Sequence, residues 1–262
     1  MKLGTATRQD IKKLELLPLD EVIKNVSIRT EYQPIVDLGS SILIGNEALA
    51  RFEYEGKLFS PEFFFSLFEK DSDEYHRLEM LTKSHQVKHR PHNTPLFLNL
   101  NPCHITKDEH IAHWESFIGK HDNIVLEIKE SKSHKEIERS KVFIDKLKEN
   151  PSLSGRFRIA LDDIFSIDSL FSSVLFMRSD IIKIDVSLTH RASEDDEQLE
   201  FLKGFTEMCK RYGKEIILEG VETLIHKQCA NFAGINFIQG YLLKDLALWN
   251  EERSLSPIGQ AI

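Results

Sequence analysis

The sequence has few cysteines and no long apolar run, and each lack excludes a class of protein. Its three cysteines, at positions 103, 209 and 229, show no Cys-x-x-Cys spacing. Neither a disulfide framework nor a thiolate zinc site is indicated, and we interpret all three as structural. No stretch approaches the about 18 consecutive apolar residues of a membrane span, and residues 1–13 lack the apolar core of a signal peptide. We therefore expect a cytoplasmic protein that does not contact a membrane.

Positive charge and glycine-rich phosphate loops are also scarce. The formal net charge is −8 at pH 7, whereas binding of long nucleic acid requires clustered lysine and arginine. We expect no long nucleic acid as a partner. A small anionic ligand remains compatible, because metal ions held by carboxylates reverse the local potential. No Gly-x-Gly-x-x-Gly follows the first strand and no Gly-Lys-Ser/Thr occurs, which argues against dinucleotide or ATP binding.

The apolar pattern predicts one large α/β domain of 262 residues, and a single barrel commonly has about 250. Residues 1–26 contain a short helical pattern around Pro18–Lys24 and are expected to form an N-terminal helical extension. Residues 27–38 and 41–52 are rich in β-branched residues and predict an antiparallel opening pair. The next expected elements are helices over 61–68 and 71–88 and a strand over 95–101.

From residue 122 onwards, strands and helices alternate. The expected strands are 122–129, 156–162, 180–186, 214–219 and 235–239. The expected helices are 134–149, a short one within 168–177, 194–212 and 223–232. This alternation favours a closed TIM-like (β/α)8 barrel with an antiparallel opening strand, and the alternative is an open doubly wound sheet. We expect the barrel to occupy 27–250 and residues 251–262 to form a C-terminal tail.

Polar residues stand at the ends of six expected strands. They are Asn99, Glu127, Asp162, Asp163, Lys183, Glu219 and Gln239. In a barrel of parallel strands the C-terminal strand ends meet at one mouth, so these side chains are expected to gather around one substrate. One such carboxylate often only caps a helix or pairs with a surface lysine. With Glu47, however, five segments offer oxygen ligands, and their mutual repulsion requires a cation.

Oxygen ligands alone predict Mg²⁺ or Mn²⁺. Adjacent Asp162 and Asp163 stand where the chain leaves the sheet, so both side chains can turn toward the mouth and two ions could share a carboxylate. Two ions about 3.5–4 Å apart stabilise the attacking and departing oxygens of a displacement at phosphorus. Lys183 could hold the attacking water or neutralise phosphoryl charge. A lysine that only neutralises buried carboxylates is an equal alternative.

The segment Tyr32–Arg51, with Glu47-Ala-Leu inside it, closely resembles the start of the EAL domain family of bacterial cyclic di-GMP phosphodiesterases. The resemblance continues in the family's order and spacing over about residues 27–245. The other matching segments are Asn99–Pro102, Glu127–Ser131, Asp162-Asp163, Lys183–Asp185, Glu219–Thr223 and Gln239–Tyr241. The resemblance implies a TIM-like barrel that hydrolyses one phosphodiester bond of cyclic di-GMP to linear pGpG with Mg²⁺ or Mn²⁺.

The resemblance also implies a role for each matching residue. The first ion would be held by Glu47, Asn99, Glu127 and Asp162, and the second by Asp162 and Asp163. Lys183 would orient the hydrolytic water, Glu219 would be a ligand or general base, and Gln239 resembles the family's water-site glutamine. Gln33, Leu49 and Arg51 resemble substrate contacts, and the planar donor fork of Arg51 suits a phosphate. A homodimer is implied as well.

One segment departs from the family pattern. The family usually follows its Asp pair with Phe-Gly-Thr-Gly-Tyr-Ser-Ser, whereas Ile164–Leu170 follow it here without either glycine. A loop that relied on positive φ cannot keep its path with Phe165 and Ile167 unless it is strained. We therefore leave open whether the second ion binds and whether dimerisation is coupled to activation. Glu130, which braces this loop in the family, is retained.

Three functions are compatible with these residues. The first is a metal-dependent phosphodiesterase, favoured by the complete set of ligands. The second is a cyclic di-GMP receptor with little turnover, suggested by the altered loop. The third is a protein-interaction module, suggested by four apolar residues beside the mouth, because clustered exposed apolar groups often mark interfaces. These residues are Phe165, Ile167, Leu170 and Phe171.

Overall fold

The computed structural model describes residues 4–91, 93–130, 133–167, 170–246, 250–251 and 256–257. The chain divides into two compact units. The first comprises Met1–Tyr32, Ala48–Pro91 and Asn250–Ile262, and the second comprises Gln33–Glu47 and His92–Trp249. None of the helices in the described ranges is long and apolar enough to cross a bilayer.

The first unit combines short helices with parts of two long strands. Its helices are α1 (Arg8–Glu15), α2 (Leu19–Asn25), α3 (Pro61–Ser66) and α4 (Asp73–Lys88). Its strands are β1 (Gly4–Thr5), β4 (Lys57–Phe59), β11 (Asn250–Glu251), β12 (Ser256–Pro257), the first part of β2 (Ser27–Asp37) and the last part of β3 (Leu43–Tyr54). Helix α1 was not expected. A capping box between Thr7 and Asp10 begins it, a signal that the sequence does contain.

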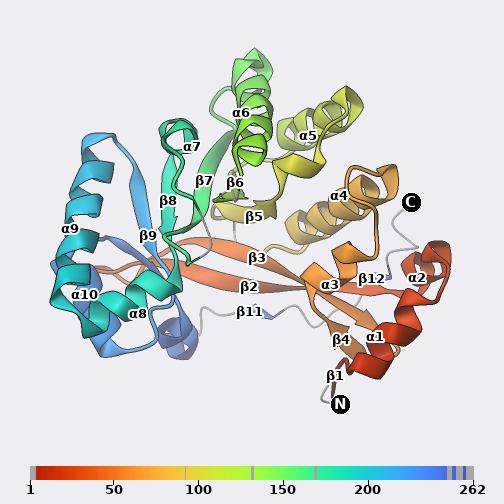
Figure 1. Cartoon of the computed structure of the whole chain (residues 1–262), viewed down its shortest axis with the longest axis horizontal. Coiled ribbons are helices and arrows are strands. Elements are labelled where there is room, and N and C mark those ends of the chain that lie inside the picture. Colours follow the sequence, from red (N-terminus) through yellow and green to blue (C-terminus); the bar gives the residue numbers. More distant parts are fainter. Residues whose placement is uncertain are drawn as a thin grey trace. The chain divides into compact units, whose positions relative to one another are not determined.

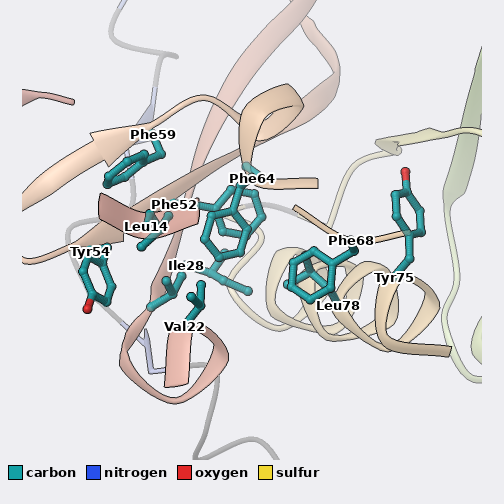
Figure 2. Packing of buried hydrophobic residues seen from close by; sticks show 12 residues of the cluster. Leu14, Val22, Ile28, Phe52, Tyr54, Phe59, Phe64, Phe68, Tyr75 and Leu78 are labelled. Atoms are coloured by element: carbon teal, nitrogen blue, oxygen red, sulfur yellow. The ribbon is translucent and has the colours of Figure 1, made fainter. Parts of the chain in front are cut away.

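Aromatic side chains form the core of the first unit. Figure 2 shows Phe64 of α3 beside Phe52 of β3, and their ring centroids lie 4.3 Å apart in a stacked arrangement. Leu14 of α1 and Leu78 of α4 are 1% exposed and belong to the same cluster. Helix α3 begins as the sequence predicts, with Ser60 accepting a hydrogen bond from the backbone N–H of Phe63. The helices of this unit are therefore held mainly by apolar burial.

Glu79 of α4 is a carboxyl group inside this unit. It is 4% exposed, and its Oε2 has no hydrogen-bond partner in the part of the chain that the structure describes. Burial raises the pKa of Glu79 from its ordinary 4.5 to about 7, although Lys83 opposes the shift. The folded state therefore retains a proton that the unfolded state has lost, and stability falls as the pH rises from 4.5 to about 7.

We expect Glu79→Gln to be about 3 kcal/mol more stable than the wild type at pH 8 and within about 1 kcal/mol of it at pH 5. The reason is that glutamine fills the same space without a proton to lose. Urea unfolding at both pH values measures the difference. Glu74→Gln, at an exposed position of the same helix, is the control. A gain for Glu79→Gln that is the same at both pH values would contradict the assignment.

The second unit alternates strands with helices (Figure 1). Its strands are β5 (Leu96–Leu100), β6 (Ile124–Lys129), β7 (Phe157–Ile164), β8 (Ile181–Ile184), β9 (Glu215–Leu218) and β10 (Phe237–Gln239), together with the last part of β2 and the first part of β3. Its helices are α5 (Asp108–Lys120), α6 (His134–Glu149), α7 (Ser173–Arg178), α8 (Val186–Glu194), α9 (Asp196–Arg211) and α10 (Leu224–Phe232). Short 3₁₀ turns are formed by Pro102–His104, Pro151–Leu153 and Tyr241–Leu246.

The strands close into a barrel. Their order is β3-β5-β6-β7-β8-β9-β10-β2, and β2 also pairs with β3, which joins eight of the described strands in a ring. Each step from β5 to β10 is parallel, whereas β10 and β2 are antiparallel. The predicted TIM-like barrel with an antiparallel opening strand is thus confirmed, and the doubly wound alternative is wrong.

Two helices of this unit differ from the sequence prediction. Helix α5 was missed, although its buried residues His110, Ile111, Trp114 and Ile118 show helical spacing. Helix α8 was also missed, and the helix expected over 194–212 corresponds to α9. Asp195 lies between them with extended backbone and caps α9 by accepting a hydrogen bond from the N–H of Glu197 at 2.8 Å.

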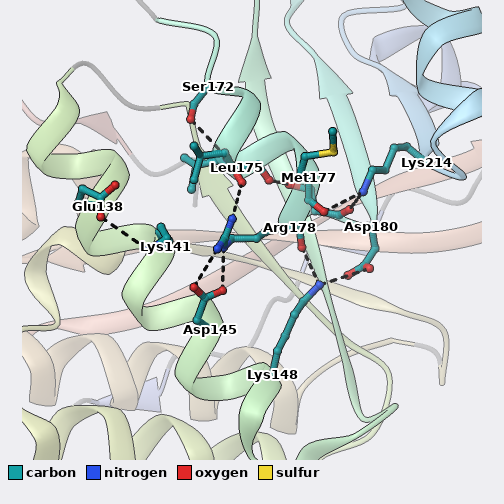
Figure 3. A network of polar contacts seen from close by, with 12 residues as sticks. Glu138, Lys141, Asp145, Lys148, Ser172, Leu175, Met177, Arg178, Asp180 and Lys214 are labelled. Carbon is teal, nitrogen blue, oxygen red and sulfur yellow. Dashed lines mark hydrogen bonds and ion pairs between the residues drawn. The ribbon is translucent and has the colours of Figure 1, made fainter.

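A polar network ties α7 to its neighbours at the start of β8 (Figure 3). Arg178 makes two hydrogen bonds to Asp145 of α6, of 2.7 and 3.0 Å. Lys148 of α6 donates to the carbonyl of Arg178 at 2.6 Å. Asp180 accepts a hydrogen bond from the N–H of Ile159 on β7 at 2.8 Å. This network fixes the start of β8, whose last residues include Lys183.

Candidate metal centre

An apolar layer inside the barrel explains where the polar strand ends point. Buried residues of six barrel strands form this layer, and they are Ile35, Phe97, Val125, Ala160, Ile181 and Ile217, with Ile44 and Phe237 packed against them. Residues two apart on a strand face the same side. Five of the polar residues therefore continue the inward face by one step toward the carboxyl ends, namely Asn99, Glu127, Asp162, Lys183 and Glu219, and Gln239 follows Phe237 in the same way. One barrel mouth therefore gathers these side chains.

Lys183 lies at the centre of the gathered residues. Its side chain is 1% exposed, and its Nζ lies 2.6 Å from Glu127, 2.7 Å from Glu219, 3.0 Å from Asp162 and 3.4 Å from Glu47. Lys183, Glu127, Asp162 and Glu47 belong to four different strands, β8, β6, β7 and β3, and Glu219 directly follows β9. The sequence prediction that they meet at one mouth is confirmed for this set.

Two amides complete the cluster. Asn99 donates from Nδ2 to Glu47 at 2.7 Å and to Glu127 at 3.1 Å. Gln239 donates from Nε2 to Glu47 Oε2 at 2.6 Å. Glu47 is brought beside Asn99 by a close approach of β3 to β5. A Cβ on Gly45 would lie only 2.8 Å from the carbonyl oxygen of Pro95, so the approach requires glycine.

The carboxylates differ in how strongly the site favours their charge. Burial, and then repulsion by Glu47, raise the pKa of Glu127 well above its ordinary value. Burial likewise raises the pKa of Asp162, and it raises that of Glu219 to about 8, although Lys183 opposes both shifts. Burial also opposes the charge of Glu47, but Lys183 and the two amides outweigh it and lower the pKa of Glu47. One ammonium group thus does not fully compensate the negative charge, which favours a further cation.

Asp163 reaches the mouth through an irregularity in β7. Ala160 and Leu161 pair with Ile181 and Ile182, but Ile164 pairs with Ile184, so β7 contains one extra residue in between. Asp163 has φ +59°, a conformation that aspartate tolerates better than most residues. The strand therefore does not end at the Asp pair, as the sequence suggested, and continues to Ile164.

Lys129, which is not among the predicted site residues, pairs with Asp163. Its Nζ lies 2.8 Å from Asp163 Oδ2, and the two side chains are 64% and 30% exposed. Lys129 is the last residue of β6, two residues after Glu127, and it lies opposite Asp162 on β7. The spacing of two from a predicted ligand is the signal that would have placed it at the mouth.

The two missing glycines predict backbone strain at Phe165 and Ile167, and the structure shows it only at Phe165. Phe165 has φ +67°, whereas Ile167 has no positive φ. The Phe165 ring contacts Phe205 and Phe201 of α9, with centroids 4.7 and 5.1 Å away. A left-handed non-glycine residue costs about 1–2 kcal/mol, and aromatic pairs contribute about 0.5–1.5 kcal/mol each. The α9 contacts therefore suffice to hold Phe165 in place.

The structure describes Glu130 and the four apolar residues that were predicted to matter in and beside this loop. Glu130 Oε2 accepts a hydrogen bond from the N–H of Phe165 at 3.4 Å. Of the four apolar residues suggested as an interface, Phe165 is half-buried against α9, whereas Ile167, Leu170 and Phe171 are exposed. Asp168 and Ser169 lie outside the described residues. A homodimer and an interface at this loop stay predictions.

The predicted substrate contacts fall in both units. Gln33 lies on β2 two residues before Ile35, so it shares the inward face of the barrel. Leu49 and Arg51 belong to the first unit, where Arg51 pairs with Glu31 at 2.6 Å. Their role as substrate contacts stays a prediction.

The residues at the mouth fit a divalent cation. Asp162, Asp163 and Glu219 each offer a carboxylate oxygen, and these oxygens lie within 4.8 Å of one another. Gln239 Oε1 is buried and accepts no hydrogen bond from the described part of the chain. All the donors are carboxylate or amide oxygens, which are the ligands that Mg²⁺ and Mn²⁺ prefer.

Comparisons with known proteins agree on one family. The sequence model of a family described as "EAL domain" matches residues 18–245. The probable cyclic di-GMP phosphodiesterase PdeG of Escherichia coli K12 is 31% identical over 238 residues, which cover 85% of this chain and 45% of PdeG. An uncharacterized Mycobacterium tuberculosis protein, Rv1354c, is 23% identical and is covered over 40% of its length. The chain thus spans less than half the length of these relatives.

Solved structures share the fold. The EAL domain of Pseudomonas aeruginosa FimX, bound to cyclic di-GMP, has a TM-score of 0.67 at 21% identity, covering 94% of this chain and 97% of that one. Klebsiella pneumoniae BlrP1, in a complex with manganese and cyclic di-GMP, has a TM-score of 0.67 at 19% identity, covering 87% and 56% of the two chains.

Proposed function

Because this chain belongs to the EAL domain family, we propose that it is a metal-dependent phosphodiesterase that hydrolyses one bond of cyclic di-GMP to give linear pGpG. The observation that carries the proposal is the set of four carboxylates, on or directly after four different strands, that converge on Lys183 within 3.4 Å. Such crowding of buried acids is unfavourable in a purely structural role. The names of PdeG and of the BlrP1 complex support the same substrate and a divalent ion.

The assignment of ligands follows the family resemblance, and the convergence of these side chains at one mouth supports it. Glu47, Asn99, Glu127 and Asp162 would hold a first Mg²⁺ or Mn²⁺, and Asp162 with Asp163 would hold a second. Such ions, when bound, polarise the phosphate and lower the pKa of bound water. The two amides orient Glu47 through their hydrogen bonds.

The remaining polar groups suit the handling of water and its proton. Lys183 lies 2.7 Å from Glu219, so one ammonium group can orient a water toward the substrate while it holds this carboxylate. Burial raises the pKa of Glu219 to about 8, and a group that titrates near neutrality is suited to accept the proton. Gln239 gives its N–H to Glu47 and keeps Oε1 available for the same water.

The test is hydrolysis by the purified protein. We expect cyclic di-GMP to be converted to pGpG in the presence of Mn²⁺, as followed by chromatography, and we expect EDTA to stop the conversion. The matched control is Glu47→Ala, which removes a carboxylate from the centre of the site. If the wild type forms no more pGpG than this variant, the protein is not a phosphodiesterase.

A receptor with little turnover is the second candidate. The left-handed Phe165 and the ion pair of Asp163 with Lys129 favour it, because both affect the segment assigned to the second ion. Calorimetry with cyclic di-GMP distinguishes the two functions. Tight binding in EDTA, without pGpG formation when Mn²⁺ is added, would establish the receptor. Absence of any binding would exclude it.

A further inference from the structure

A lysine occupies the outer side of the carboxylate cluster, next to the place assigned to the second ion. The ammonium group of Lys129 lies 2.8 Å from Asp163. Burial opposes its charge, but the hydrogen bond to Asp163 and the charges of Asp163, Asp162 and Glu47 outweigh burial and raise the pKa of Lys129. Lys129 also lies opposite Asp162 on the neighbouring strand β7, so its ammonium group borders the carboxylate cluster.

We propose that Lys129 is a built-in monovalent cation that competes with the second divalent ion at Asp163. The protein then binds one divalent ion tightly and a second one weakly, and Lys129 sets the difference. The inference rests on the proposed function, because it takes the mouth to be a site for divalent ions. It deepens that function by assigning metal stoichiometry to one residue outside the predicted ligand set.

The charge at the mouth supports competition. Glu47, Glu127, Asp162, Asp163 and Glu219, when ionised, are accompanied by the ammonium groups of Lys183 and Lys129, which leaves a formal charge of −3. One divalent ion reduces this to −1, and a second ion would reverse it to +1. Without Lys129, two divalent ions would bring the site to neutrality. Because Lys129 lies 2.8 Å from Asp163, its charge penalises an ion at Asp163 more than an ion deeper in the cluster.

The geometry also separates Lys129 from the first ion. Glu127 and Asp162 are buried, and Lys183 already contacts both. The Asp163 side chain, in contrast, is 30% exposed, and Asp163 lies at the extra residue of β7 with φ +59°. Its backbone is held further by a hydrogen bond from the N–H of Ser166 to the Asp163 carbonyl, 3.1 Å long. The Asp163 carboxylate thus stays beside Lys129, while the side chain of Lys129, 64% exposed, can move aside at a modest cost.

The test is a titration of the metal-free protein with Mn²⁺, read by calorimetry and by the electron paramagnetic resonance signal of free Mn²⁺. We expect Lys129→Met to bind the second ion about tenfold more tightly than the wild type, with little change for the first. Lys129→Arg keeps the charge and should resemble the wild type. Lys146 of α6 pairs with Asp108 of α5 at 2.6 Å. Lys146→Met therefore controls for net charge and should also resemble the wild type.

Each other outcome overturns a stated part of this scheme. If wild type and Lys129→Met bind both ions with the same affinities, or if both bind a single ion, Lys129 does not compete and the phosphodiesterase proposal is unaffected. If Lys146→Met raises the affinity for the second ion as much as Lys129→Met does, the effect is one of overall charge. If the wild type binds no Mn²⁺ at all, the metal site of the proposed function fails together with this inference.

Discussion

Replacing Lys183 with methionine is expected to destabilise the metal-free protein by about 3–5 kcal/mol, because it leaves a group of buried carboxylates without their cation. Four acids lie within 3.4 Å of its ammonium group, and no part of the lysine is appreciably exposed. Urea unfolding in EDTA measures the loss. Excess Mn²⁺ should restore much of the stability, because a divalent ion supplies the missing positive charge.

The matched control for this variant is Lys146→Met, which breaks a surface pair and should change stability by less than about 1 kcal/mol. The alternative readings of Lys183 are separated by the same data. If Lys183 only orients water, Lys183→Met should lower activity without destabilising the metal-free protein. If metal-free Lys183→Met were as stable as the control, the central role of Lys183 among the carboxylates would be wrong.

Replacing Glu127 with glutamine is expected to have the opposite profile. Burial and repulsion by Glu47 already disfavour the charge of Glu127 in the metal-free protein, so the neutral glutamine should change stability by no more than about 1 kcal/mol. Hydrolysis of cyclic di-GMP should fall at least about 100-fold, because the first ion loses a carboxylate. Unfolding in EDTA and the rate of pGpG formation measure the two effects.

Together the two variants test whether Lys183 is the cation that stabilises a group of crowded carboxylates. Lys183→Met removes the cation and should lower stability, whereas Glu127→Gln removes one of the crowded anions and should lower activity alone. A Glu127→Gln protein that hydrolyses at the wild-type rate would show that Glu127 is not a ligand. Loss of stability in Glu127→Gln equal to that in Lys183→Met would show that its charge is structural.

Strand ends were the part of the site that the sequence predicted best. The reason is geometric: a period of two fixes the face on which Glu127, Asp162 and Lys183 lie, and parallel strands bring their carboxyl ends to one mouth. The motif order also placed Glu47 correctly beside Asn99, which local periodicity alone could not do. Gly45 is the physical cause of that contact, because it allows β3 to approach β5.

Features that depend on a single backbone irregularity were not predictable. The extra residue in β7 changes the direction of Asp163, and no local sequence pattern predicts this extra residue. The pairing of Asp163 with Lys129 depends on that redirection, so Lys129 was missed. The strain at Phe165 was expected from the missing glycine, but the α9 rings that stabilise it come from distant sequence.

The predicted helix boundaries were wrong where a capping side chain, and not the apolar spacing, decides where a helix begins. The helix expected over 194–212 corresponds to α9, but it starts only after Asp195, which has an extended backbone and separates α9 from the unpredicted helix α8. Helix α1 begins at the Thr7 and Asp10 capping box. In both places a side-chain oxygen that accepts a backbone N–H decides the boundary.

Anomalous diffraction at the manganese edge, from crystals grown with Mn²⁺ and cyclic di-GMP, would locate the metal site directly. We expect a strong manganese peak bounded by Glu47, Asn99, Glu127 and Asp162, with a phosphate of the nucleotide beside it. A map with no manganese at these residues, and with Lys183 still in contact with all four carboxylates, would contradict this expectation.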